Sequence, residues 1–388
     1  MPDVVVVGGG PIGSRLAYRL STQGYQVVVL EKNLQIGKKL CCTGILSQQC
    51  VTDFAIPSSV VWREVNSAKI YAPSGEFIRI QRPETQAYIV NRPALDLALA
   101  DAAMKAGAEY RLKSKVEQIQ HWPGKVVVQV VEPGRIYNLE AQCVVLATGF
   151  AVPLVRKLKL GQPRYLVTGV QVEVETSGLE EVEVYFSQTL APAFFAWLVP
   201  TQNGKGLAGL MSPSSAGLYI RNWLDDLKNQ SKILTLNSRI QYSGIPLKPL
   251  SRTYAERILV VGDAAGQVKP TTGGGIYFGL IGADIAAETI HKAFQTGNFS
   301  ARRLSDYERA WKKKLGQELR QEYYARRIYT HLNDQQINKL FSGLKSSGIV
   351  ESMLKEETIS FDWHGGLLLK AFKSGLLGSF KRLLHKSS

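Results

Sequence analysis

Two glycine-rich segments near opposite ends of the chain hold the residues best suited to chemistry. The first follows four consecutive valines, and its Gly8, Gly10 and Gly13 fit the G-x-G-x-x-G pattern of a strand-to-helix turn. Free backbone N–H groups at the start of such a helix bind phosphate. A second strand over residues 26–30 ends in Glu31, whose carboxylate is placed to accept both hydroxyls of an adenosine ribose. This segment therefore predicts a dinucleotide site.

The second segment carries an acid and another run of glycines. An apolar strand ends in Gly262-Asp263, and Gly273, Gly274 and Gly275 then open a long apolar helix. The start of that helix offers free N–H groups and a positive dipole end, which suit an electron-rich or anionic ligand. A simple nicotinamide site has no need of this distant segment, whereas FAD is longer and carries a ribitol that the Asp263 loop can bind. The two segments together favour FAD.

These segments resemble those of the p-hydroxybenzoate hydroxylase-like FAD superfamily, in which a Gly-Asp motif contacts the ribitol. The resemblance implies that Arg92, which begins a predicted helix reaching Gly107, lies near the FAD phosphates. It also implies that residues 144–149 form the strand that returns the chain to the flavin domain. Taken singly, Arg92 and Thr148 are equally consistent with an ordinary helix start and an ordinary turn.

Length and composition describe the frame that must position these residues. The 388 residues, of which 45% are hydrophobic and 20% charged, can bury a core large enough for about two domains. We expect an α/β protein with a glutathione-reductase-like FAD/NAD(P)-binding Rossmann-type domain, an inserted antiparallel β-sheet substrate domain and a C-terminal helical segment. The expected boundaries are 1–66, 84–160 and 245–298 for the FAD-binding domain, 67–83 and 161–244 for the substrate domain, and 299–388 for the basic helical region.

The inserted segments have the alternation and turn residues of strands. Residues 68–80 predict a hairpin around Pro73-Ser74-Gly75. Four further strands are expected at 166–174, 181–186, 194–199 and 206–210. The strand over 194–199 is very apolar for a position beside an active site, and most of its residues are also consistent with plain core positions.

The middle of the chain narrows the resemblance to the geranylgeranyl reductase family, flavoenzymes that saturate isoprenoid double bonds. Phe195-x-Trp197-x-Val199-Pro200 resembles the family's aromatic-x-Trp-x-Phe-Pro motif, and the turn that begins at Cys42 resembles its Cys-containing small-residue element. The similarity runs from residue 2 to roughly 330. Because Val199 replaces the usual aromatic residue, chain-length and head-group preferences do not carry over.

The resemblance implies an FAD-dependent reductase that saturates C=C bonds of geranylgeranyl chains on a lipid, quinone or chlorophyll-type head group. It implies catalytic roles for three residues. Trp197 and Phe195 belong to an apolar wall that excludes water and stabilises developing positive charge. Cys42 lies near the flavin ring, either as a proton donor or as a small apolar wall residue.

Three other activities compete with this interpretation. A flavin monooxygenase or halogenase of the same superfamily is disfavoured because the chain contains no Asp-Gly dipeptide. A non-redox, flavin-dependent isoprenoid cyclase would resemble the lycopene cyclases. An electron-transfer module that reduces quinone would need an iron–sulfur cysteine set, which Cys41, Cys42, Cys50 and Cys143 do not supply at their spacings.

The sequence predicts no metal site, because no His, Cys and carboxylate cluster has ligand spacing. None of the five histidines falls in a segment expected at the flavin, so no general acid stands out. No second G-x-G-x-x-G unit is present for a resident nicotinamide. We therefore expect electrons from an acidic carrier protein such as ferredoxin, or from transiently bound NAD(P)H.

The net charge of +15 gathers toward the end of the chain, where residues 301–388 hold 17 Lys/Arg against 9 Asp/Glu. No nucleic-acid module is visible, so an anionic membrane surface or an acidic carrier is the expected partner. Residues 367–384 predict an interfacial amphipathic helix, or else a C-terminal helix packed on the body. No apolar run is long enough to span a membrane. We expect a cytoplasmic protein with reduced thiols, or one bound peripherally to the inner face of the membrane.

Overall fold

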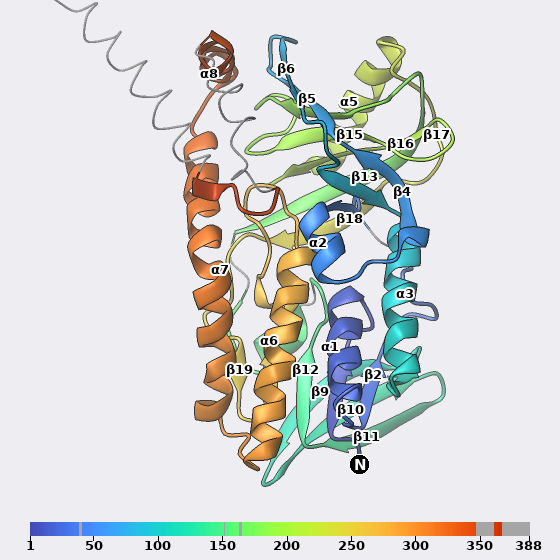
Figure 1. Ribbon diagram of the computed structural model, residues 1–388, viewed down its shortest axis with the longest axis vertical. Helices are drawn as coiled ribbons and strands as arrows, with labels where there is room; N and C mark the ends of the chain where they lie inside the picture. Colours follow the sequence, from blue (N-terminus) through green and yellow to red (C-terminus); the bar gives the residue numbers. More distant parts are fainter. Residues whose placement is uncertain (39–40, 151, 163–164, 347–360, 367–388) are drawn as a thin grey trace, which may run out of the picture. The chain divides into compact units, whose positions relative to one another are not determined.

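The computed structural model describes residues 1–388 except 39–40, 151, 163–164, 347–360 and 367–388 (Figure 1). The chain divides into two compact units, each assembled from three separate segments. Unit 1 contains residues 1–40, 91–166 and 245–317, and unit 2 contains residues 41–90, 167–244 and 318–388. The domain boundaries expected from the sequence remain a prediction.

Unit 1 is built on a sheet whose strand order, among the described residues, is β19-β20-β12-β1-β2-β8. All neighbouring strands run parallel except β19 and β20. The strands are β1 (Val4–Val7), β2 (Val27–Leu30), β8 (Glu109–Arg111), β12 (Cys143–Leu146), β19 (Tyr254–Ala255) and β20 (Ile258–Val260). Every residue of β1, β2 and β12 is buried, as expected of parallel strands that are covered on both faces.

Different layers cover the two faces of this sheet. Helix α1 (Pro11–Ser21) packs against α3 (Arg92–Lys105) and α6 (Ile276–Gln295) on one face (Figure 1). On the other face lies an antiparallel meander of β9 (Lys115–Trp122), β10 (Lys125–Glu132) and β11 (Arg135–Ala141). Alternate valines of β10 share one hydrophobic core with β1, β2 and β12. The dinucleotide motif therefore lies on a three-layer frame.

Unit 2 is built on a larger sheet with the order β17-β13-β16-β15-β14-β5-β6 among the described residues, and β18 also pairs with β13. Along this order the pairing is antiparallel except between β14 and β5, which run parallel. The strands are β5 (Ser67–Tyr71), β6 (Phe77–Gln81), β13 (Leu166–Thr176), β14 (Val182–Phe186), β15 (Phe195–Pro200), β16 (Lys205–Ser212), β17 (Ile233–Leu236) and β18 (Gln241–Pro246).

The two faces of this sheet have different neighbours. One face packs on helix α5 (Ala216–Asn229), whose Ile220, Trp223 and Leu227 enter a closed core. The other face lies against a small sheet of β3 (Ile45–Ser47), β7 (Ala87–Val90) and β4 (Val61–Val65). Several hydrophobic side chains of this second layer are only partly buried.

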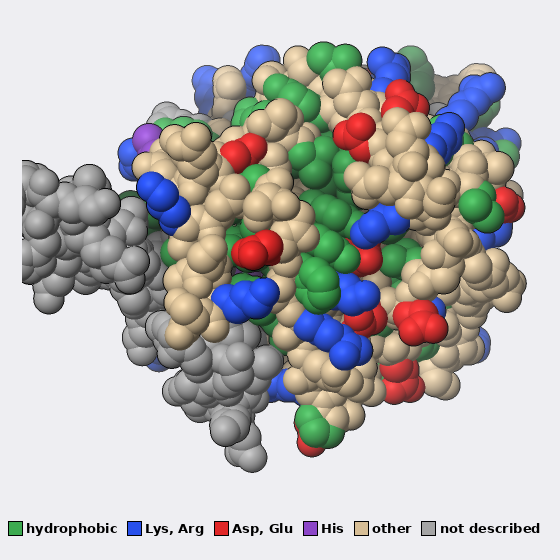
Figure 2. Space-filling view, turned by 90° about the horizontal axis from the view of Figure 1, so that it is seen from above, with side chains coloured by type: hydrophobic (Ala, Val, Ile, Leu, Met, Phe, Trp, Pro, Cys, Tyr) green, Lys and Arg blue, Asp and Glu red, His purple; other side chains and the backbone are tan. Residues whose placement is uncertain are grey.

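The remaining described elements complete the two units. They are α2 (Gln48–Asp53), the 3₁₀ turns η1 (Ser58–Val60) and η2 (Gly262–Ala265), α4 (Val152–Lys157), α7 (Ala301–Tyr329) and α8 (Asp334–Ser346). Tyr329 at the end of α7 packs with Ile337 and Phe341 of α8 against the β5–β6 hairpin. Figure 2 looks onto the end of unit 2 where this hairpin, α5 and α8 lie, and shows hydrophobic side chains near the middle of that face with charged side chains around them.

The predicted elements compare closely with the structure. The hairpin over 68–80 is confirmed as β5 and β6, and the four strands of the substrate sheet are confirmed within a few residues. The meander of β9 to β11 was not assigned from the sequence. The predicted amphipathic helix over 367–384 lies outside the described residues. No helix in the described part of the chain is long and apolar enough to cross a membrane.

Candidate active site

The turn between β1 and α1 can be made only with glycine at two places. A Cβ on Gly13 would lie 2.0 Å from the carbonyl oxygen of Gly8, and that oxygen belongs to the backbone and cannot swing aside. Gly8 has φ +110°, and a Cβ there would lie 2.4 Å from the carbonyl oxygen of Ala147. By contrast, a Cβ on Gly10 would meet no protein atom within 4 Å. The helix start therefore borders open space at Gly10, where a phosphate can approach the backbone.

Glu31 is held in one orientation at the end of β2. One of its carboxylate oxygens accepts a hydrogen bond from the backbone N–H of Gly9 at 2.9 Å. The other accepts from the backbone N–H and the side-chain amide of Asn33, at 2.8 and 2.7 Å. A carboxylate has about four acceptor sites, of which these three bonds take two on Oε1 and one on Oε2. The remaining site on Oε2 can still accept from a ribose hydroxyl.

Asp263 occupies a tight position in the turn η2. Its Oδ1 lies 2.5 Å from where a Cβ on Gly275 would be, so the glycine leaves room for the carboxylate. Burial raises the pKa of Asp263, and the positive charge of Arg92 opposes that rise. Within the described residues the carboxylate has no hydrogen-bond or ion-pair partner, although it keeps some exposed surface. It is therefore an acceptor available to a ligand that brings hydroxyl groups.

Arg92 stands at the first turn of α3, where the side chain of Asn91 caps the helix by accepting from the N–H of Ala94 at 3.1 Å. Its Nη2 donates to Asp96 at 2.7 Å, and both side chains are more than nine-tenths buried. Burial raises the pKa of Asp96 while Arg92 lowers it. The guanidinium is thus anchored by Asp96 and acts electrostatically on Asp263.

The loop before α6 is closed on itself. Lys269 N–H donates to the carbonyl of Gly274 at 3.0 Å, and Gly273 N–H donates back to the carbonyl of Lys269 at 2.9 Å. The chain then enters α6 with Gly275 as its N-cap. The predicted glycine-opened helix start is therefore present, with its backbone drawn into a compact turn beside Asp263.

One further polar atom belongs to this region. The hydroxyl of Thr148, which follows β12, is buried and has no hydrogen-bond partner among the described residues. Its Cα lies 3.3 Å from where a Cβ on Gly8 would be, next to the dinucleotide turn. The open space at Gly10, the free carboxylate of Asp263 and this hydroxyl all fit a ligand that carries phosphates and a polyhydroxyl chain. All predicted cofactor residues therefore lie together in unit 1.

The predicted catalytic residues lie in unit 2. Phe195 and Trp197 project from the same face of β15, and their rings are in edge-to-face contact with centroids 6.0 Å apart. A Cβ on Gly209, the partner of Trp197 on β16, would lie 2.4 Å from the indole Cζ2. The indole therefore rests on bare backbone. Its Nε1 is buried and has no partner among the described residues.

Cys42 is held on the same sheet face by Gln171, a residue that was not predicted from the sequence. Gln171 of β13 pairs with Gly209, which pairs in turn with Trp197, so the three residues form one row across the sheet. The side-chain amide of Gln171 donates a hydrogen bond to the backbone carbonyl oxygen of Cys42 at 3.3 Å. A polar residue among the buried valines of β13 was the available signal for Gln171, and no local signal distinguished Gly209 from other glycines.

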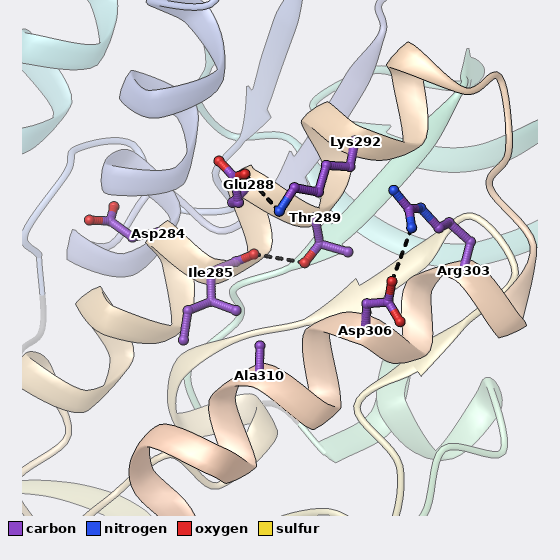
Figure 3. A pocket seen from close by; sticks show the side chains of 8 residues that line it. All are labelled: Asp284, Ile285, Glu288, Thr289, Lys292, Arg303, Asp306 and Ala310. Carbon is purple, nitrogen blue, oxygen red and sulfur yellow. Dashed lines mark hydrogen bonds and ion pairs between the residues drawn. The ribbon is translucent and has the colours of Figure 1, made fainter.

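A groove between α6 and α7 is a separate feature of unit 1 and has a volume of about 370 Å³ (Figure 3). Its charged side chains are paired: Lys292 binds Glu288 at 2.9 Å, Arg303 binds Asp306 at 3.1 Å, and Asp284 binds Arg15 of α1 at 2.7 Å. None of the predicted site residues lines it. The candidate cofactor site is therefore at the glycine turns of unit 1, and the predicted catalytic residues are on the Trp197 face of unit 2; neither is in this groove.

Comparison with solved structures shows the fold. The chain superposes on a geranylgeranyl bacteriochlorophyll reductase-like protein from Thermoplasma acidophilum with a TM-score of 0.86 and 24% identity, covering 99% of this chain and 98% of that one. It also superposes on p-nitrophenol 4-monooxygenase from Pseudomonas putida with a TM-score of 0.75 and 18% identity, covering 91% and 96% of the two chains.

Comparison with protein families and curated sequences shows the relationship. The model of the lycopene cyclase protein family matches residues 3–204. Digeranylgeranylglycerophospholipid reductase 2 of Methanothermobacter thermautotrophicus is 32% identical over 363 residues, or 89% of this chain and 92% of that protein. Digeranylgeranylglycerophospholipid reductase of Methanocaldococcus jannaschii is 30% identical over 366 residues, or 89% and 91% of the two chains. The chain therefore belongs to the geranylgeranyl reductase family, as a relative of the digeranylgeranylglycerophospholipid reductases.

Proposed function

We propose that this protein is an FAD-dependent reductase that saturates C=C bonds in the geranylgeranyl chains of an isoprenoid lipid. The observation that carries the proposal is the similarity to curated digeranylgeranylglycerophospholipid reductases over about nine-tenths of the chain. The glycine turns of unit 1 and the aromatic face of unit 2 support it, because they supply a dinucleotide cradle and an apolar surface.

Unit 1 would hold FAD with the residues that the sequence indicated. Glu31 accepts from the adenosine ribose, and the N–H groups at Gly10 and the start of α1 receive a phosphate. The Arg92 guanidinium neutralises phosphate charge from its anchored position. Asp263 accepts from ribitol hydroxyls, and Gly273–Gly275 allow close approach of the backbone to the ring. The fit rests on the free carboxylate of Asp263 and the open space at Gly10.

FAD, when bound and reduced, would supply a hydride to one carbon of the double bond. The residues of unit 2 govern the environment of the alkene. Trp197 and Phe195 exclude water, and their ring faces stabilise positive charge that develops on the more substituted carbon. We place Cys42 at the same surface, where its Sγ either holds the proton for the second carbon or serves as an apolar wall.

The test is an anaerobic turnover with the full-length protein. Its flavin is reduced chemically, geranylgeranylated glycerophospholipid is added, and the product masses are recorded. A ladder of products, each heavier by two hydrogens, supports the reductase and counts the reduced bonds. Unchanged lipid beside stable, fully reduced flavin would overturn the proposal and favour the monooxygenase or halogenase activity.

We propose an acidic electron-carrier protein as the reductant. On the part of α7 in unit 1, Arg302 and Lys313 are exposed and lie eleven residues apart along one side of the helix, with the ion pair of Arg309 and Asp306 between them. Such a stripe attracts an acidic partner and raises its association rate at low ionic strength. Reduction by an acidic ferredoxin that slows as salt is added supports this donor, whereas fast salt-independent reduction by NADPH would replace it.

We also propose that the protein acts at an anionic membrane surface, because its substrate class is lipid and its net charge is +15. Co-sedimentation with vesicles of phosphatidylglycerol, but not of phosphatidylcholine, supports this proposal. Binding to neither kind of vesicle would contradict it.

The match to the lycopene cyclase family model over residues 3–204 supports a second candidate function. This is a flavin-dependent isoprenoid cyclase that performs no net reduction. The same anaerobic assay separates the two functions. A cyclised product has the mass of its substrate and a changed retention time, whereas a reduced product is heavier.

A further inference from the structure

Gln171 is a buried glutamine whose side chain makes two hydrogen bonds to one short segment. It is 5% exposed in the middle of β13. Its Nε2 donates to the carbonyl oxygen of Cys42 at 3.3 Å, and its Oε1 accepts from the hydroxyl of Thr43 at 3.0 Å. Burying an amide is costly unless both of its ends are paired, and here both ends are paired with residues 42 and 43.

The preceding residue, Cys41, is fastened to the same strand by its thiol. Its Sγ lies within hydrogen-bond distance of the carbonyl oxygens of Gly169 at 3.7 Å and Gln241 at 3.6 Å. Burial, and secondarily the neighbouring Cys42, raises the pKa of Cys41 to about 12. The thiol therefore stays protonated at neutral pH, which keeps it a donor and makes it a poor nucleophile.

The segment is closed on its other side by the small sheet of unit 2. The backbone N–H of Val90 donates to the carbonyl oxygen of Gly44 at 2.9 Å, immediately before β3 begins. Gly44 has φ +71°, which lets the chain turn there. Residues 41–44 are thus each held by at least one hydrogen bond, although the segment belongs to no helix or strand.

The row across the large sheet connects this segment with the aromatic face. Gln171, Gly209 and Trp197 are direct neighbours on β13, β16 and β15, so their side chains share one face and span about 10 Å. Because Gly209 has no side chain, the indole of Trp197 covers the middle of the row. A methyl there would also lie 2.7 Å from the carbonyl oxygen of Val170, which is backbone and cannot move aside.

We infer that Gln171 is a positioning residue which, together with Cys41, acts as a clamp that fixes Cys42 and Thr43 on the sheet face that carries Trp197, where the isoprenoid chain is proposed to bind. The identity of the ligand rests on the proposed function. The clamp itself rests only on the contacts that hold residues 41–43. Cys41 is then an anchor and Cys42 the residue it presents, which gives the two adjacent thiols different roles.

The clamp is tested through the reactivity of Cys42 in the full-length protein, measured as the rate of N-ethylmaleimide labelling at Cys42 itself. Fragment-ion mass spectrometry separates it from Cys41 and Cys50, which share its tryptic peptide. Cys50 and Cys143 are buried and serve as internal references for global unfolding. Gln171→Leu keeps the approximate volume but removes both hydrogen bonds, so the released segment should be populated about 10- to 100-fold more often and Cys42 should label correspondingly faster. Gln129→Leu, on the meander of unit 1, should leave the rate unchanged.

Graded variants protect the test against misfolding. Thr43→Val removes one bond and should accelerate labelling about 2- to 10-fold. Gln171→Glu keeps the acceptor for Thr43 and should fall between wild type and Gln171→Leu. Wild-type labelling rates in folded Gln171→Leu and Thr43→Val would overturn the clamp.

The functional part is tested by kinetics on the same variants. Gln171→Leu should raise KM for the geranylgeranyl lipid about tenfold or more, with FAD affinity unchanged, and Gln171→Glu should recover part of the loss. Faster labelling with unaltered KM and kcat would overturn the role in substrate positioning. If the wild-type protein does not reduce the lipid at all, the proposed function fails while the labelling result still decides the clamp.

Discussion

The glycine turns of unit 1 differ in chemical character from the aromatic face of unit 2, which carries Phe195 and Trp197. The turns bring backbone close to backbone and leave charged groups such as Asp263 open to a ligand. The aromatic face consists of apolar side chains, and its buried amide, Gln171, is turned inward to hold the protein's own chain. This contrast is why we propose that unit 1 recognises a polar ligand and unit 2 an apolar one.

This difference explains which residues a sequence motif can reveal. Close approach of backbones forces glycine at fixed spacing, as at Gly8 and Gly13, and the spacing is visible in the chain. A sheet surface is set by pairing between distant strands, as in the row from Gln171 through Gly209 to Trp197. Such a row leaves no local pattern.

The largest effect is expected for Gly13→Ala. The added methyl would lie 2.0 Å from the carbonyl oxygen of Gly8, so the turn must open at a cost of about 1–3 kcal/mol, and FAD binding should be lost. Gly10→Ala is the matched control for folding, because its methyl meets no protein atom within 4 Å and intrudes only on the ligand. Thermal melting and FAD titration should show both properties impaired in the first variant and only binding impaired in the second. Equal melting temperatures for the two variants would contradict the steric argument.

Trp197→Ala tests whether the two regions are functionally separate. Removing the indole should leave FAD affinity within about twofold and reduce turnover of the geranylgeranyl lipid by about 100-fold or more, because the apolar surface is lost. Trp122→Ala removes an indole that is 50% exposed in the meander and should change neither property. Normal turnover by Trp197→Ala would show that the aromatic face does not contact the substrate.

Asp263→Asn sharpens the comparison by separating stability from binding. Burial raises the pKa of Asp263 above its unfolded value, so the folded apoprotein retains a proton that the unfolded chain has released. Stability of the apoprotein should then fall as pH rises from the ordinary carboxyl pKa through the raised one. The variant should flatten that slope in melting curves and weaken FAD binding by about 10- to 100-fold. An unchanged slope would mean that the carboxylate is not destabilising.

The smallest effect is expected at the surface of α7. Reversing two charges with Arg302→Glu and Lys313→Glu should slow flavin reduction by an acidic ferredoxin about three- to tenfold at low ionic strength, and the difference should vanish in high salt. Lys105→Glu, an exposed reversal at the end of α3, is the control. Identical salt dependence in the wild type, the double variant and the Lys105→Glu control would exclude α7 as the docking surface.

Much of the fold follows from local patterns in the sequence. Four buried valines in β1, the glycine turn after them and the apolar helix after Gly275 identify the parallel sheet of unit 1. The alternating strands of unit 2 were also recognisable. The meander over residues 115–141 was not assigned, although β10 has alternating buried valines, because its role depends on packing against a sheet formed elsewhere in the chain.

The candidate site residues that have a local sequence signal were predictable, and those defined by strand register were not. Gly8, Glu31 and Asp263 were found from residue type and spacing, because each lies at the end of a strand. The resemblance to a family supplied Cys42 and Trp197. Gln171 stands out in the sequence only as a polar residue among the valines of β13, and Gly209 not at all, because the significance of both appears only when β13, β16 and β15 are placed in register.

The long reach of the strand pairings has a consequence for how the chain acquires its structure. In unit 1, Val4 of β1 pairs with Cys143 of β12, and β12 pairs in turn with β20. In unit 2, β5 pairs with β14, which follows it by more than a hundred residues. Closing such large loops costs entropy before native contacts can compensate, so folding should be slow and late. During synthesis neither sheet can be completed from the first half of the polypeptide. Exposed strand edges at residues 67–81 then await β14, which makes the nascent chain dependent on protection from aggregation until that strand has emerged.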